Sequence, residues 1–375
     1  MNQMNYKLLN KIGSSILAQF PPDSLVEANN AWENECNGYS HKRKKQGYEC
    51  LLHNHECNGK AINSHSIPKK NLRMMSNNSK VYVLKDDFKN PFKSNLSTAY
   101  IKSTLTFSGF CKYHDSSLFQ EIENKNTTQY NNKDVFFLSY RALAKEYSDI
   151  RELTEKYSWV LDNWKSEKKK RLDKEWALFQ ADKMKNLNMN VSQRKKKCLK
   201  TYFERRVLDK QKLKAALRKC HIQERHLRRK LESFNTLINN GKIFESHYVI
   251  FQNENQIAFS LACDFSVKNR TVFFYFISLP QKDGSLMILT CKREDYERIK
   301  DYSEIKKLFS GDEVSINRLL NQFKEKIAID GTNIGLKYAD PFFLEWDISL
   351  ATIPYFRQKG NNKTIEGHSG RCNNL

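Results

Sequence analysis

Three patterns of apolar and polar residues follow one another along the chain. The stretch up to about residue 135 is irregular and rich in Asn, Ser, Cys and His, apart from an amphipathic segment at residues 6–20. From about residue 136 to 240 the apolar residues recur at i, i+4, i+7 and i+8, and proline is absent. This spacing predicts two long helices, which we expect to fold back on each other as an antiparallel hairpin resembling a coiled coil.

The pattern changes at Gly241, where short apolar runs of strand length begin. Turn-forming residues such as Asp283-Gly284 separate the runs, so neighbouring runs are expected to pair in an antiparallel sheet. Helical spacing returns after the last run. The expected strands cover residues 248–251, 257–261, 271–277 and 286–289, and the expected helices cover residues 294–309 and 315–329.

These patterns predict an α+β multidomain protein, because strands and helices occur in separate blocks of the sequence. The last block is followed by a Gly- and Asn-rich tail, which is expected to be disordered. The predicted parts are an N-terminal module at residues 1–135, the helical hairpin at 136–240, a C-terminal α+β domain with an antiparallel sheet at 241–357, and the tail at 358–375.

Composition and charge narrow the class of protein. The 375 residues include 64 Lys and Arg against 42 Asp and Glu, a net charge of +22, and 39% of them are hydrophobic. No apolar run approaches the ~18 residues of a membrane span, and the N-terminus lacks the features of a secretory signal. We therefore expect a cytoplasmic protein without a membrane partner, bound to a polyanion such as nucleic acid.

Most of the excess positive charge falls on the predicted hairpin. Residues 165–230 hold 24 Lys and Arg against 7 Asp and Glu, a surplus of 17. Too few acidic residues are present for i,i+4 pairing, which favours a nucleic-acid backbone as partner over a solvated face or an acidic protein. The predicted nucleic-acid contacts are Lys168, Lys169, Lys170, Arg171, Arg194, Lys195, Lys196, Lys197, Arg228, Arg229 and Lys230.

Nine cysteines, an odd number in a long chain, favour reduced thiols over a disulfide framework. Cys50 and Cys57 can supply one half of a tetrahedral site, and Cys111 and His114, spaced C-x2-H, can supply the other half. We therefore predict a structural Zn²⁺ site, although these thiols could also be unrelated buried side chains. Other candidate ligands are His53, His55 and Cys36.

Two segments resemble the HNH-type (ββα-metal, treble-clef zinc) nucleases over roughly residues 45–125. Ser64-His65-Ser66-Ile67-Pro68 is similar to the family's catalytic histidine segment, and residues 109–115 are similar to the knuckle that closes its zinc site. The resemblance implies that His65 is the general base and that Asp115 occupies the place of the last metal-binding side chain. It also implies a catalytic divalent ion, Mg²⁺ or Mn²⁺, at the scissile phosphate.

Simpler roles remain open for these residues. His65 could be a zinc ligand or a packed imidazole, and Asp115 could be a carboxylate that the dipole of a helix N-terminus favours. Ser64 stands where the family often has an acidic residue or a histidine. Residues that could orient His65 are Asn63, Asn71, Asn95 and Thr104.

The sequence therefore predicts a metal-dependent endonuclease that cleaves nucleic acid, with DNA favoured, and by analogy a bacterial defence effector. The alternative is a non-catalytic, zinc-containing protein that binds nucleic acid or takes part in an assembly. In either case a protein partner could bind the helical hairpin or the C-terminal domain.

Overall fold

The computed structural model describes residues 47–163, 210–312 and 314–316, except residues 55, 58, 88, 89, 126–128, 254 and 255, together with residues 39, 42, 43, 45, 46, 166, 169, 173, 319, 328 and 329. The chain forms two compact units, and each combines two separate stretches of sequence. The first unit contains Met1–Gln46 and Ile150–Glu224, and the second contains Gly47–Asp149 and Arg225–Leu375.

Two long helices contribute to both units: α5 (Asn132–Asp162) and α8 (Lys210–Asn239). In the first unit, the last turns of α5 bind the segment before residue 47. Tyr39 stacks on Trp159 with ring centroids 5.1 Å apart, and Arg43 pairs with both carboxylate oxygens of Glu155 at 3.0 and 3.4 Å. Within the described part of the chain, no helix combines the length and the low charge that crossing a membrane requires.

The second unit contains one antiparallel sheet of seven strands in the order β3-β2-β9-β6-β7-β8-β5. Strands β6, β7 and β8 are joined by tight hairpins, and β5 pairs with β8, which is the order of a Greek key. The strands are β2 (Lys80–Asp87), β3 (Asn90–Tyr100), β5 (Ser246–Asn253), β6 (Ile257–Val267), β7 (Arg270–Gln281), β8 (Gly284–Lys292) and β9 (Ala328–Ile329).

Strand β7 is covered on both faces, which explains its continuous apolar sequence. Successive side chains of a strand point to opposite faces. Accordingly, Tyr275 lies against Phe234 of α8, with ring centroids 5.9 Å apart, whereas Phe274 lies against Phe309 of α10 at 5.7 Å. The second face is closed by two short helices, α9 (Arg293–Glu297) and α10 (Ser303–Phe309).

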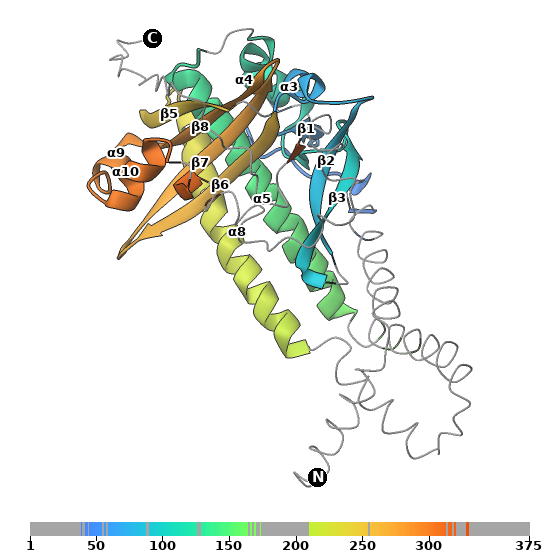
Figure 1. Cartoon of the computed structure of the whole chain (residues 1–375). Helices are drawn as coiled ribbons and strands as arrows, with labels where there is room; N and C mark the ends of the chain where they lie inside the picture. The colour runs from blue at the N-terminus through green and yellow to red at the C-terminus, as the bar shows by residue number, and fades with distance from the viewer. Residues whose placement is uncertain are drawn as a thin grey trace. The chain divides into compact units, whose positions relative to one another are not determined.

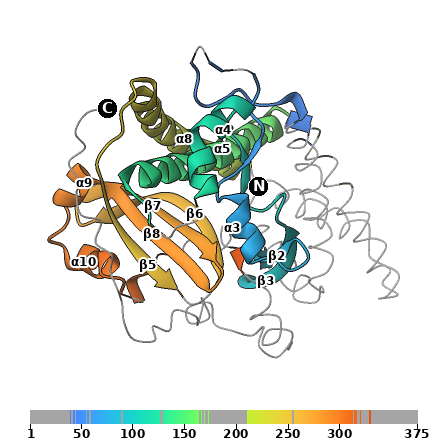
Figure 2. The same cartoon turned by 90° about the horizontal axis from the view of Figure 1, so that it is seen from above.

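Helices α5 and α8 pack antiparallel on the other face of the sheet (Figure 2). Phe136 and Tyr140 near the start of α5 contact Phe234 near the end of α8, at centroid distances of 4.9 and 5.4 Å. Further along α5, the ring of Tyr147 lies 5.9 Å from the guanidinium of Arg228, which is earlier in α8. The contacts therefore run in opposite directions along the two helices.

The N-terminal part of the second unit is a small Cys/His module, which we define as residues 47–124 without the β2–β3 hairpin. Its elements are β1 (Asn63–His65), α3 (Lys69–Met74), β4 (Thr106–Ser108) and α4 (Lys112–Asn124). Strands β1 and β4 pair antiparallel, with His65 opposite Thr106. Strand β1 and helices α3 and α4 are labelled in Figure 1. Backbone bonds from Leu51 to Gly109 and from Ile62 to Phe110, both 2.7 Å, attach the cysteine-containing loop to the segment that enters α4.

The predicted mixture of helices and an antiparallel sheet is confirmed, with three differences in detail. The hairpin β2–β3 lies in a segment expected to be irregular. Residues 294–309 form two helices, α9 and α10, rather than one. The helix expected over residues 315–329 is wrong at its end, because Ala328–Ile329 form strand β9, which pairs with β2 and β6. The predicted domain boundaries stay predictions, and the tail at 358–375 lies outside the described residues.

Candidate metal centre

Four side chains from two distant segments meet in the Cys/His module. Cys50 and Cys57 belong to the loop before β1, Cys111 immediately precedes α4, and His114 lies in the first turn of that helix. The C-x2-H spacing places Cys111 and His114 on the same side of the helix start. Cys50, Cys111 and His114 are buried, whereas Cys57 is partly exposed.

The possible ligand atoms all lie within 4.8 Å of one another. The Nδ1 atom of His114 lies 3.2 Å from the Sγ atom of Cys50 and 3.5 Å from that of Cys111, and the Sγ atoms of Cys57 and Cys111 are 4.0 Å apart. Tetrahedral zinc bonds of ~2.3 Å to sulfur and ~2.0 Å to nitrogen separate neighbouring ligand atoms by about 3.5 to 3.8 Å. The cluster could therefore hold a metal ion such as zinc.

Hydrogen bonds fix the orientation of the histidine in this cluster. The Nε2 atom of His114 lies 2.9 Å from Oδ1 of Asn54, and the same oxygen accepts the backbone N–H of Glu56 at 3.0 Å. Because an amide oxygen only accepts, Nε2 carries the proton and Nδ1 presents its lone pair to the cysteines. Burial lowers the pKa of His114, which favours the neutral ring that a metal requires.

Burial also makes an isolated thiolate costly here, since it raises the pKa of Cys50 to about 12. The backbone N–H of Cys111 donates to the Sγ atom of Cys50 at 3.2 Å and partly offsets that cost. A bound cation would offset it further.

His65, the predicted general base, lies outside this cluster. It ends β1, is half-buried, and has its Nε2 atom 2.9 Å from the carbonyl oxygen of Ile101. A carbonyl oxygen accepts only, so Nε2–H is the donor and Nδ1 of the neutral ring carries the lone pair. Burial lowers the pKa of His65, and the nearby cations Arg141 and Lys69 lower it further. The imidazole is therefore neutral at pH 7.

Asp115, the predicted metal-binding carboxylate, lies in the first turn of α4 and pairs with Arg141 of α5. The Nη2 atom of Arg141 lies 3.4 Å from Oδ1 of Asp115 and 2.6 Å from Oε1 of Glu123. Arg141 is only 1% exposed, stacks on Phe119 at 4.3 Å, and leaves Nε and Nη1 without a hydrogen-bond partner among the described residues. Two carboxylates thus share one buried cation.

Two of the four residues considered for orienting His65 have other hydrogen-bond partners. Asn71 donates to the carbonyl oxygen of Pro280 at 2.9 Å, and the hydroxyl of Thr104 donates to the carbonyl oxygen of Tyr100 at 2.9 Å. Asn63 is exposed, and the side chain of Asn95 lies outside the described residues. The group that orients His65 is a backbone carbonyl, which residue identity alone does not reveal.

The structure describes only some of the other residues that the sequence suggested as metal ligands or nucleic-acid contacts. His53 pairs with Glu49 at 3.4 Å and is not in the cluster, while His55 and Cys36 lie outside the described residues. Of the basic residues, Lys169, Arg228 and Arg229 are exposed, and the ammonium of Lys230 lies 4.6 Å from the ring centroid of Phe273. Those outside the described residues are Lys168, Lys170, Arg171, Arg194, Lys195, Lys196 and Lys197.

The Cys/His cluster stands alone in the described part of the chain, where no other group of three or more Cys, His, Asp or Glu side chains converges in this way. Sequence reasoning did not identify Asn54, Glu123 or Arg141. Comparison with known protein families, with curated proteins and with solved structures gives no match to this chain.

Proposed function

We propose that the Cys/His module is a zinc-stabilised unit that hydrolyses phosphodiester bonds, with His65 as its general base. The observation that carries the proposal is the hydrogen bond of His65: its Nε2–H is held by the carbonyl oxygen of Ile101, which leaves the lone pair on Nδ1. Burial lowers the pKa of the ring and so favours its neutral form. A base of this kind can accept a proton from water near neutral pH.

Zinc would have a structural role in this proposal. Cys50, Cys57, Cys111 and His114 would together fill all four places of a tetrahedral site, which is typical of structural rather than catalytic zinc. The bound ion would hold the cysteine loop against the start of α4. Strand β1 follows that loop in the chain and pairs with β4, which precedes α4. A zinc ion that joins the loop to α4 would therefore fix the position of His65 indirectly.

In the reaction, Nδ1 of His65 takes a proton from a water molecule while the water oxygen forms a bond to phosphorus. The bond from phosphorus to the leaving oxygen breaks, and that oxygen then takes a proton from solvent. A Mg²⁺ or Mn²⁺ ion bound by Asp115 and the substrate phosphate would stabilise the negative charge of the transition state. Arg141 would keep the Asp115 carboxylate in place.

A cleavage assay on the full chain tests this proposal. Wild type should cut DNA or RNA with Mg²⁺ or Mn²⁺, and His65→Ala should lose at least ~100-fold in rate while keeping its zinc content and its fold. His53→Ala is the matched control, because this histidine is in the same module but exposed. The pKa of His65 is lowered from 6.5, so the acid limb of the pH–rate profile should fall below pH 6.5. An active His65→Ala protein would refute its role as the base.

A second function, nucleic-acid binding without cleavage, is favoured by the pairing of Asp115. Its carboxylate has Arg141 as a counter-charge, so its ionised form is satisfied without a metal ion. Under this alternative the wild type retains stoichiometric zinc and binds nucleic acid, yet cleaves neither DNA nor RNA across a series of divalent ions.

A further inference from the structure

Tyr100 is an exposed aromatic residue with two lysines beside its ring. The side chain is 51% exposed, and the ammonium groups of Lys80 and Lys102 lie 5.1 and 5.7 Å from the ring centroid. Both lysines are themselves exposed. Both ammonium groups lie over the ring as cation–π contacts. The group therefore combines an aromatic ring on which a base can stack with two cations that can pair with the adjoining phosphates.

The backbone holds this group of side chains in place. Lys80 and Tyr100 are paired residues of β2 and β3, so their side chains share one face of the hairpin. After β3 the chain forms a turn in which the carbonyl oxygen of Tyr100 accepts the hydroxyls of Ser103 and Thr104, at 3.0 and 2.9 Å. The same oxygen accepts the backbone N–H groups of Ser103 and Thr104, at 2.9 and 3.1 Å.

A residue of this turn, Ile101, also contacts His65, the proposed catalytic histidine. Ile101, between Tyr100 and Lys102, donates its N–H to the carbonyl oxygen of Ser79 at 3.0 Å and accepts the Nε2–H of His65 at 2.9 Å. Leu105, four residues later, accepts the N–H of Ser66 and has a φ of 53°, a strained value for a leucine. The exposed aromatic ring is therefore one residue from the carbonyl that orients His65.

We propose that Tyr100, Lys80 and Lys102 form a binding platform for one unpaired nucleotide of a nucleic-acid strand, and we call it the Tyr100 platform. The base stacks on the ring of Tyr100, and the adjoining phosphates are bound by the two lysines. This inference rests on the proposed function and specifies its substrate: a strand with an unpaired base next to the phosphodiester bond that is cleaved with His65 as general base.

Binding of fluorescently labelled oligodeoxythymidylate and oligouridylate by the full chain tests the platform. The assay uses fluorescence anisotropy in a buffer without Mg²⁺ and without chelators, so that nothing is cleaved and zinc stays bound. Tyr100→Ala should weaken binding of single strands roughly 5- to 150-fold, as expected for the loss of one stacked base, and Tyr100→Phe should restore most of it. A blunt DNA duplex should bind Tyr100→Ala as tightly as wild type.

Substitution of a platform lysine should change a different measured quantity, the dependence of binding on salt concentration. Lys102→Gln should reduce the slope of log K against log salt by about 0.7 on single strands, whereas Tyr100→Ala should leave that slope unchanged. Met74→Ala is the matched control for Tyr100, because Met74 is a large apolar residue of the same compact unit that is similarly exposed, at 47%, and is not part of the platform. Loss of binding in Met74→Ala equal to that in Tyr100→Ala would overturn the platform.

Failure of the platform and failure of the nuclease proposal give different results. If wild type binds neither oligonucleotide, or if Tyr100→Ala binds both like wild type, the platform is refuted whatever the cleavage assay shows. If single-strand binding depends on Tyr100 but no divalent ion supports cleavage, the platform stands and the nuclease proposal fails. A preference for thymidylate or uridylate distinguishes DNA from RNA as the source of the nucleotide.

Discussion

Asn54 determines which nitrogen of His114 faces the cysteines, although it is not a ligand itself. Its Oδ1 atom accepts the Nε2–H of His114 at 2.9 Å. Replacing it with alanine should leave all four ligands in place but free the ring to rotate or change tautomer. We expect Asn54→Ala to bind zinc about 10- to 100-fold more weakly than wild type.

Competition with a chromophoric zinc chelator measures this change in affinity. Asn63→Ala is the matched control, since Asn63 is an exposed asparagine of the same module. Its zinc affinity should equal that of wild type. Equal affinities of Asn54→Ala and Asn63→Ala would show that the bond to His114 does not contribute to metal binding.

For single residues, some contacts could be predicted from the sequence and others could not. The spacing of Cys50, Cys57, Cys111 and His114 was sufficient to predict the cluster, because ligand type and local spacing are properties of the sequence. The carbonyl group of Ile101 was not predictable, since every residue has a carbonyl. Arg141 was also missed, because its burial beside Asp115 depends on how α5 packs.

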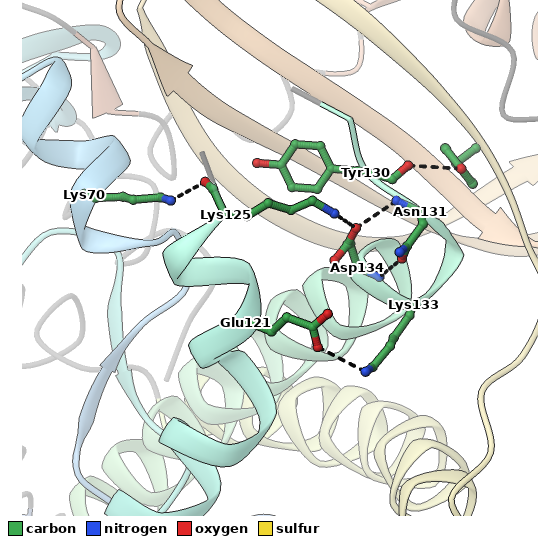
Figure 3. Close-up of polar contacts among 8 residues, drawn as sticks. Lys70, Glu121, Lys125, Tyr130, Asn131, Lys133 and Asp134 are labelled. Atoms are coloured by element: carbon green, nitrogen blue, oxygen red, sulfur yellow. Dashed lines mark hydrogen bonds and ion pairs between the residues drawn. The ribbon is translucent and has the colours of Figure 1, made fainter. Parts of the chain in front are cut away.

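The start of α5 is a capping box that includes a buried charge (Figure 3). The N–H of Asn131 donates to Oδ2 of Asp134 at 2.8 Å, and the N–H of Asp134 donates back to Oδ1 of Asn131 at 2.9 Å. The ammonium of Lys125, which follows α4, pairs with the same Oδ2 atom, and Lys70 of α3 donates to the carbonyl oxygen of Lys125. Asp134 therefore links the end of α4 to the start of α5, and the backbone of Lys125 is in turn held by α3.

Asp134→Ala should lower the free energy of unfolding by about 2–4 kcal/mol. The change removes one of the two hydrogen bonds of the capping box, worth about 1 kcal/mol, and leaves the largely buried ammonium of Lys125 without its carboxylate partner. Urea denaturation followed by circular dichroism measures the loss. The ion pair between Lys133 and Glu121 supplies the control; its nitrogen and oxygen atoms are 3.0 Å apart, and Figure 3 also draws it.

Glu121→Ala should cost at most about 1 kcal/mol, because Lys133 and Glu121 are 54% and 68% exposed and water screens their attraction. Both substitutions remove an ion pair between a lysine and a carboxylate, but only Asp134 is buried and also accepts a hydrogen bond at the start of α5. If both variants lost the same stability, the cap and the burial of Asp134 would have no special role at the start of α5.

The elements show why some of the fold was predictable and some was not. Strands β5 to β8 were predicted because they are strongly apolar and bounded by turn residues. Strand β3 was missed because it is polar and carries Pro91, which is tolerated at the beginning of an edge strand. Strand β9 has two residues, too few for a periodic signal, and its pairing with β2 and β6 is set by tertiary context.

At the scale of the whole molecule, the net charge of +22 predicts that any affinity for nucleic acid falls as the salt concentration rises. Most of the surplus lies between residues 165 and 230, and two neighbouring residues near the end of that segment differ in their surroundings. Arg229 is exposed, whereas Lys230 is half-buried with its ammonium 4.6 Å from the ring centroid of Phe273. Burial lowers the pKa of Lys230.

Substitution of these two residues separates charge that is proposed to contact phosphate from charge that stabilises the fold. Arg229→Gln should reduce the slope of log K against log salt on a blunt DNA duplex by about 0.9, without changing the free energy of unfolding. Lys230→Gln removes the same unit of charge but should instead lower the free energy of unfolding by about 1 kcal/mol and leave the slope unchanged, because its cation interacts with Phe273. Zinc content should be unaffected in both variants, since neither residue is in the Cys/His module. Equal slopes for wild type and Arg229→Gln would remove this face of α8 from the nucleic-acid interface.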